Sequence, residues 1–283
     1  MPELPEVETM VRDLRARVEG RTIVSARVYW DRLVAYPDRE AFEARVSGHA
    51  IETIERRGKF ALFSLSGNAT LAIHRGMTGS LFLRDRAASD DRFVRARFGL
   101  DNGAELRFDD SRKFGRLYFI EAGDALYQPP WARLGPEPLE PRLQGTTLAR
   151  QLARRSEAIK TTLLNQSVVA GVGNIYADEA LFVARIHPTR PANSLTRPEI
   201  KRLAAAISDV LESAIAGRGT TFSTYKDIDG AVGTNQHLLN VFYRHGQPCY
   251  RCGATVQRIV LGARGTHFCP RCQRLPKSAV AAG

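Results

Sequence analysis

The chain has 283 residues, of which 43% are hydrophobic and 25% charged, values that are ordinary for a globular protein. This composition excludes a fibrous or wholly disordered chain, and no run of about 18 apolar residues is present that could form a membrane-spanning helix. The 41 Lys and Arg residues exceed the 30 Asp and Glu residues and give a net charge of +11, which favours a polyanionic partner over a merely solubilising surface.

The first part of the chain is expected to form one helix and then many short strands. Residues 5–19 carry apolar side chains at the spacing of one helical face, and Gly20 ends the pattern. Strand-like runs follow at residues 22–30, 60–65, 70–74, 80–84, 92–100, 105–108 and 116–120. Because these runs do not alternate with helices, they predict a β-sandwich or barrel and not a doubly wound sheet.

The second part of the chain is expected to be helical. Five prolines between residues 128 and 145 indicate a linker. Helical patterns follow at residues 146–155, 157–165, 174–184 and 196–216, and residues 218–240 are predicted to form a loop. We therefore expect an α+β, multidomain protein with an N-terminal β-sandwich and flanking helices over residues 1–128, a linker over 129–145, a helical domain over 146–240 and a cysteine module over 241–277.

All four cysteines lie near the end of the sequence, in two C-x₂-C pairs that sixteen residues separate. They are Cys249, Cys252, Cys269 and Cys272. This spacing is typical of a tetrahedral Zn²⁺ site, and four thiolates would close the coordination shell of a single structural ion. The alternatives are a redox dithiol pair and a remnant of a metal site that binds no metal. The absence of other cysteines and of a secretory signal favours a reducing, cytoplasmic compartment.

The residues around the cysteines are strongly basic. Residues 243–277 contain seven Arg and Lys side chains and no Asp or Glu, which indicates a phosphate-facing surface.

The N-terminus carries a second pattern with chemical meaning. Removal of Met1 would leave Pro2 with a secondary amine, and the attack of that amine on a sugar C1′ atom would give an iminium ion. Glu3 beside it could transfer protons. Proline and glutamate are also common where helices begin, so these residues by themselves leave both explanations open.

Six motifs in the same order resemble those of one enzyme family. They cover residues 1–9, 57–60, 74–80, 110–115, 134–139 and 171–176, and the four cysteines complete the series. Over essentially its whole length the chain resembles the bacterial formamidopyrimidine-DNA glycosylases. The related endonuclease VIII branch typically has Gly in place of Leu4, which favours the branch that acts on purine lesions.

The resemblance implies a bifunctional DNA glycosylase and abasic-site lyase of base-excision repair. Such an enzyme removes 8-oxoguanine and formamidopyrimidines from double-stranded DNA. Pro2 would attack C1′, Glu3 would move protons at the sugar, and the iminium would cut the strand by β- and δ-elimination. Lys59 matches a lysine that contacts phosphate beside the lesion. Glu6 matches a functional carboxylate, although its place in the first turn of a helix explains it equally well.

The resemblance also implies a set of DNA contacts. Met77, Arg112 and Phe114 match side chains that enter the duplex when the lesion flips out, although Met77 and Phe114 also fit an ordinary core. Lys160 and Asn174 match residues near the DNA backbone in a helix–two-turn–helix domain, with Asn174 as the expected helix cap. Arg264, in the expected zinc hairpin, matches an arginine that contacts the phosphates at the flipped nucleotide.

The sequence departs from the family pattern at four positions. Phe93 stands where a histidine is usual, Asn235 where an aromatic is usual, and Phe242-Tyr243 replaces a Tyr-Gly pair. These changes put lesion preference and the geometry of the 218–240 lesion loop in question. The alternatives are an endonuclease VIII-like enzyme for oxidised pyrimidines and a non-catalytic protein that binds damaged DNA. We expect a monomer with no membrane association.

Overall fold

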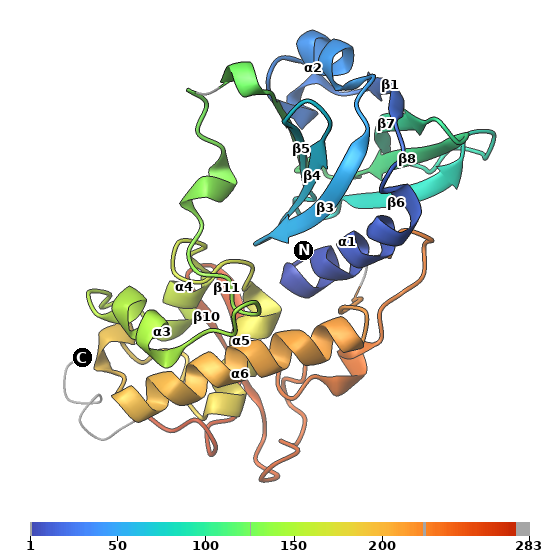
Figure 1. The fold of residues 1–283 in the computed structure, drawn as a ribbon. Helices are drawn as coiled ribbons and strands as arrows, with labels where there is room; N and C mark the ends of the chain where they lie inside the picture. Colours follow the sequence, from blue (N-terminus) through green and yellow to red (C-terminus); the bar gives the residue numbers. More distant parts are fainter. Residues whose placement is uncertain (1, 125, 223–224, 276–283) are drawn as a thin grey trace. The chain divides into compact units, whose positions relative to one another are not determined.

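The computed structural model describes residues 2–124, 126–222 and 225–275 (Figure 1). The chain divides into two compact units. The sandwich unit comprises residues 1–132 and 215–236, and the helical unit comprises residues 133–214 and 237–283. None of the helices in the described part of the chain combines the length and the hydrophobicity needed to cross a membrane.

The sandwich unit contains two β-sheets that share one hydrophobic core. The first sheet has the order β1-β7-β8-β6, from Ile23–Val28, Val94–Leu100, Ala104–Asp109 and Ser80–Asp85. The second has the order β2-β9-β5-β4-β3, from Val34–Tyr36, Arg116–Ile120, Ala69–His74, Phe60–Leu65 and Ile51–Arg57. All neighbouring strands are antiparallel except β2 and β9. The predicted sandwich is confirmed.

Two helices flank the sheets, and in Figure 1 α2 lies above them and α1 lies below them. Helix α1 spans Leu4–Val18 and buries one apolar stripe in the core of the sandwich. Helix α2 spans Arg39–Val46, and the Asp38 carboxylate caps it by accepting the Ala41 N–H at 2.9 Å. The sequence patterns did not predict α2, β2 or β3. In α2 only Phe42 and Val46 are buried, so its periodic signal is weak.

The helical unit contains four α-helices and a β-hairpin in its described residues. The helices are α3 (Gly145–Leu152), α4 (Ile159–Leu164), α5 (Asn174–Ala184) and α6 (Arg197–Ala216), the last ending two residues inside the sandwich unit. Strands β10 (Gln257–Leu261) and β11 (Arg264–Phe268) pair in the antiparallel sense. Short 3₁₀ turns cover Asp31–Leu33, Ala122–Asp124, Pro130–Arg133, Ala192–Ser194 and Asn235–Leu238.

One prediction about α5 was wrong. Asn174 is the first residue of the helix, and the capping position before it is Gly173, which has extended backbone angles. The Asn174 side-chain amide instead donates to the Gly265 carbonyl oxygen at 3.2 Å.

Candidate active site and nucleic-acid interface

The start of α1 places Pro2 and Glu3 beside a third buried residue, Glu6. The Glu3 N–H donates to Glu6 Oε2 at 2.7 Å, and Glu6 Oε1 accepts the Thr220 N–H at 2.8 Å. Charge-assisted bonds of this kind are short and strong. Glu6 therefore fixes the backbone at Pro2–Glu3, which supports a positioning role for it. The expected removal of Met1 concerns a residue outside the described part of the chain.

A buried arginine, Arg75, connects α1 with the turn that follows β5. Its guanidinium donates to the carbonyl oxygens of Glu6 at 3.3 Å and Gly79 at 2.7 Å, and to the Ser80 hydroxyl at 3.3 Å. Burial lowers the pKa of Arg75, but a guanidinium remains charged in a protein. These bonds hold residues 75–80 against the first turn of α1.

Lys59 lies at the turn between β3 and β4, next to His74 at the end of β5. The pairing of β4 with β5 sets Phe60 opposite His74, and Lys59 is only 9% exposed. Burial, followed by the positive charges of Lys59 and Arg116, lowers the pKa of His74 to about 4. The imidazole is therefore neutral at pH 7. Lys59 is thus a largely buried cation.

The structure brings Met77, Arg112 and Phe114 onto two adjoining turns, which we call the wedge turns (residues 76–79 and 110–115). Phe114 is 46% exposed and Arg112 is exposed, while Met77 is half-buried. The Arg112 guanidinium lies 5.0 Å from the centre of the Phe114 ring. An exposed cation stacked on an exposed aromatic ring does not fit the core explanation of Phe114.

A residue that the motif analysis left without a role, Asp110, holds the wedge turns together. Its fully buried carboxylate accepts the Thr78 hydroxyl, the Gly115 N–H at 2.8 Å and the Arg112 N–H at 3.2 Å. The two turns are in close contact, because a Cβ atom built on Gly76 would lie 2.5 Å from the Phe114 carbonyl carbon. Gly76 also has a φ of +62°, a conformation that glycine adopts without strain.

In the helical unit, Lys160 and Asn174 both bond to the carbonyl oxygen of Gly265, the residue that follows Arg264. The Lys160 ammonium donates to this oxygen at 2.9 Å and the Asn174 amide donates to it at 3.2 Å. Arg264 precedes Gly265 and is exposed. Lys160 is fully buried and also pairs with Asp178 at 2.7 Å, so it lies behind the surface and supports the turn that carries Arg264.

The hairpin that carries Arg264 has a two-residue turn at Gly262-Ala263, and both residues have positive φ angles. This turn type matches the twist of paired strands and sets the direction of the next side chain. The hairpin is also fixed to α5, because Asp178 Oδ2 accepts the His267 N–H at 2.8 Å.

The four cysteine sulfur atoms lie within 4.8 Å of one another. The Cys252 and Cys269 sulfur atoms are 3.5 Å apart, and the Cys249 and Cys272 sulfur atoms are 4.0 Å apart. Tetrahedral coordination with Zn–S bonds of about 2.3 Å requires sulfur atoms about 3.8 Å apart, so these distances fit one Zn²⁺ ion. The predicted grouping of the four cysteines into one structural zinc site is confirmed.

The four departures from the family pattern lie in different surroundings. Asn235 is buried and donates to the Thr220 hydroxyl at 2.7 Å. The Phe93 ring lies 5.0 Å from the Arg92 guanidinium. The Phe242 N–H donates to the buried Glu179 carboxylate at 2.9 Å, and Tyr243 follows with a φ of +60° and an exposed ring.

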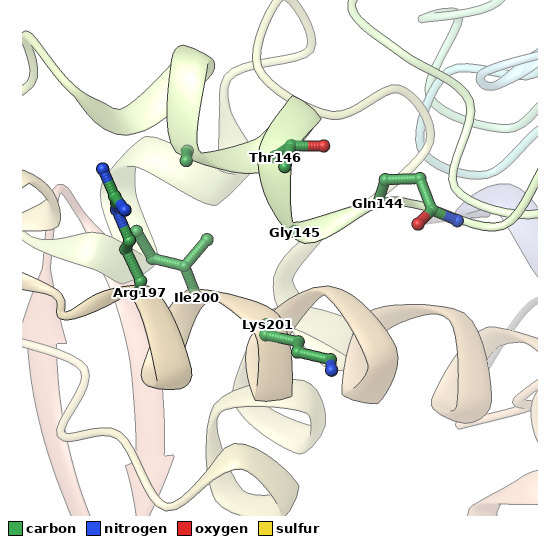
Figure 2. Close-up of a pocket in the computed structure, with 7 residues that line it drawn as sticks. Gln144, Gly145, Thr146, Arg197, Ile200 and Lys201 are labelled. Carbon is green, nitrogen blue, oxygen red and sulfur yellow. The ribbon is translucent and has the colours of Figure 1, made fainter.

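Of two cavities in the described residues, one is lined by a predicted site residue and the other is not. A cavity of about 390 Å³ in the helical unit is lined by Asn174, Tyr243 and Gly265 among others. A larger one of about 630 Å³ lies between α3 and α6 (Figure 2), where Arg197, Ile200 and Lys201 face the start of α3. Among the described residues, no predicted site residue lines this larger cavity, so the candidate site lies elsewhere.

Three family models match the chain in succession. They are the formamidopyrimidine-DNA glycosylase N-terminal domain over residues 1–117, the H2TH domain of the same enzymes over residues 134–226, and a zinc finger found in FPG and IleRS over residues 246–275. The formamidopyrimidine-DNA glycosylase of Symbiobacterium thermophilum is 48% identical, over 98% of this chain and 90% of that protein.

Solved structures give the same result. The MutM (FPG) protein of Thermus thermophilus is 42% identical, with 97% of this chain and 100% of that chain covered and a TM-score of 0.87. A Lactococcus lactis FPG mutant in complex with DNA that contains Fapy-dG is 35% identical, with the same coverage and a TM-score of 0.89. The chain therefore belongs to the formamidopyrimidine-DNA glycosylase family.

Proposed function

We propose that this chain is a base-excision repair enzyme that removes oxidised purines from DNA and cuts the strand at the abasic site that remains. The observation that carries the proposal is the Pro2–Glu3 pair, buried at the start of α1 with its backbone held by Glu6. This placement suits a nucleophile that must meet one atom of a flipped nucleotide. Relatives have been solved in complex with DNA that contains Fapy-dG or an abasic site, which supports damaged DNA as the substrate.

In the proposed reaction the Pro2 nitrogen forms a bond to C1′ as the bond between C1′ and the damaged base breaks. The damaged base leaves with a proton, and the Pro2 nitrogen gives up its own proton. The bond between C1′ and the ring oxygen O4′ then breaks as O4′ takes up a proton, which opens the sugar ring and leaves an iminium ion that withdraws electrons from the sugar. Loss of a C2′ proton then expels the 3′ phosphate, and a second elimination expels the 5′ phosphate. Glu3 moves the protons at the sugar.

The remaining site residues bind and deform the DNA. Met77, Arg112 and Phe114 fill the space that the flipped base leaves, and the Arg112 guanidinium offers donors to the base opposite. Lys59 and Arg264 contact phosphates, with Asn174 at the same turn as Arg264. Lys160 supports that turn from behind, and one Zn²⁺ ion on the four cysteines holds the hairpin. We place the protein in the cytoplasm as a monomer.

The test is covalent trapping. Borohydride reduction in the presence of a duplex with an abasic site should link protein to DNA, and peptide mass analysis should place the link at Pro2. Pro2→Thr should lose at least about 100-fold in trapping rate while its DNA affinity changes by less than about twofold. Pro130→Thr, at an exposed proline, is the matched control and should trap normally.

Two outcomes would contradict the proposal. Absence of trapping by folded, DNA-binding protein with Met1 removed would favour the non-catalytic binder. Faster excision of thymine glycol than of 8-oxoguanine from otherwise identical duplexes would favour the endonuclease VIII-like alternative.

A further inference from the structure

An arginine at the beginning of the lesion loop joins that loop to the exposed side of α1. The Arg218 guanidinium contacts both carboxylate oxygens of Asp13, at 3.2 Å and 2.7 Å. It also donates to Asp227 at 2.8 Å, farther along the loop. Its bonds to Asp13 and then Asp227 raise the pKa of Arg218, so it remains charged under all assay conditions. We call these three residues the arginine clamp.

The backbone at Arg218 is in a conformation that side chains disfavour. Its φ is +56°, in the left-handed region, and that of the next residue, Gly219, is +84°. A non-glycine residue persists there only when its surroundings hold it in place. The charge-assisted bonds of the arginine clamp supply that restraint, and the turn they fix leads the chain from α6 into the loop.

The turn directs the Thr220 N–H onto Glu6, at 2.8 Å from Oε1. Packing at this point is tight, because a Cβ atom on Gly219 would lie 3.0 Å from both Glu6 Cγ and the Tyr225 ring. The Thr220 hydroxyl is also held, since it accepts from the Asn235 amide at 2.7 Å. Glu6 in turn restrains the backbone at Glu3, because its other oxygen, Oε2, accepts the Glu3 N–H at 2.7 Å.

We propose that Arg218 is a positioning residue for catalysis. It acts through Thr220 and Glu6 to hold the backbone of Glu3 and of the nucleophile Pro2. It touches neither Pro2 nor Glu3 in the described contacts, so its effect on the reaction is indirect. The inference rests on the proposed function. It predicts that loosening the arginine clamp slows the chemical step while the binding of DNA is retained.

The experiment separates the rate of chemistry from affinity. Single-turnover trapping on a duplex with an abasic site gives the rate constant at saturating protein, and fluorescence anisotropy on a duplex with a tetrahydrofuran site gives the Kd. Arg218→Ala and Asp13→Asn should each slow trapping about tenfold and change the Kd less than about twofold. The double variant should be no slower than Arg218→Ala, because the two residues form one interaction. Arg218→Lys, which keeps the charge but not the bidentate bond, should restore part of the rate.

Arg17 provides a matched control on the same helix. The Arg17 guanidinium pairs with Asp229 of the loop at 2.6 Å, and its side chain is about as exposed as that of Arg218. In the described contacts, however, neither Arg17 nor Asp229 bonds to Thr220 or Glu6. Arg17→Ala should therefore trap at the wild-type rate.

Different outcomes would contradict the positioning role of Arg218 and the proposed enzymatic function. Wild-type trapping rates in Arg218→Ala and Asp13→Asn would overturn the inference, as would an equal loss in Arg17→Ala. If Arg218→Ala does not fold, as judged by circular dichroism, the conservative Asp13→Asn variant still decides. Failure of the wild-type protein to trap would instead contradict the proposed function.

Discussion

At the scale of single residues, the site depends on buried charges whose partners are backbone groups. Glu6 accepts two backbone N–H groups, Arg75 donates to three carbonyl oxygens, and Asp110 accepts two N–H groups and one hydroxyl. Backbone partners are fixed by the fold, so these side chains have little freedom to adjust. The reacting groups next to them are preorganised, which is the property that catalysis requires of a site.

His74 gives the protein a predictable sensitivity to acid. Its pKa is about 4 in the fold, against an ordinary value of 6.5, because of burial and then the charges of Lys59 and Arg116. Between these values the unfolded chain binds the proton and the folded chain does not, so stability is lost as the pH falls from about 6.5 to about 4. The loss from this residue is up to roughly 3 kcal/mol.

This expectation can be checked by thermal unfolding across pH 4 to 7.5. His74→Gln should lose less stability on acidification than the wild-type protein, because glutamine does not titrate in this range. His187→Gln is the comparison variant, since burial also lowers the pKa of His187. Parallel pH curves for His74→Gln and the wild type would rule out this role for His74.

At the scale of elements, α5 organises the helical unit. Asp178 and Glu179 on this helix are both buried. Asp178 binds the β11 strand through His267, and Glu179 accepts the N–H groups of Val241 and Phe242 at the start of the cysteine module. The module is further joined to the end of α5 by Gln273, whose amide donates to the Ile186 carbonyl oxygen at 2.9 Å. The position of Arg264 therefore depends on α5 and on the metal together.

Removal of the metal should release the hairpin. Cys249→Ala deletes one of four ligands, and structural zinc sites of this size contribute much of the folding energy of their module. We expect loss of bound zinc, measured by mass spectrometry, and at least about a tenfold loss in affinity for an undamaged duplex, because Arg264 is no longer held. Chelation followed by addition of Zn²⁺ to the wild-type protein is the control and should restore binding. Normal binding by a zinc-free protein would refute this expectation.

At the scale of the whole molecule, the net charge of +11 supplies long-range attraction to DNA. The phosphate contacts we propose, Lys59 and Arg264, lie in different units, so each unit contributes to binding.

Binding should therefore weaken as salt increases. Each neutralised phosphate contributes a slope of about −0.9 to a plot of log K against log salt, so these contacts predict a slope of at least about −2. Anisotropy titrations between 50 and 300 mM KCl measure it. Arg264→Ala should make the slope shallower by about one, whereas Arg39→Ala, a surface arginine that pairs with Asp31, should leave it unchanged. A flat salt profile would contradict phosphate-based binding.

The sequence by itself determined the features that follow a local rule. The apolar spacing of α1 and α6, the runs that became β4 and β9, and the two C-x₂-C pairs were all predictable, since a helix, a strand and a zinc knuckle each impose a fixed spacing on nearby residues. The motifs identified the family for the same reason, because the residues that recognise one substrate recur in one order.

Only the tertiary structure decided which distant residues share a contact. Strand β3, with two buried residues in seven, carries little alternation of its own and is defined by pairing with β4. Lys160 lies in the interior because Asp178 and Gly265 converge on it, and Arg218 meets Asp13 across more than 200 positions of sequence. No fixed spacing encodes such pairs: their energy comes from burial and charge compensation, which exist only after the chain has folded.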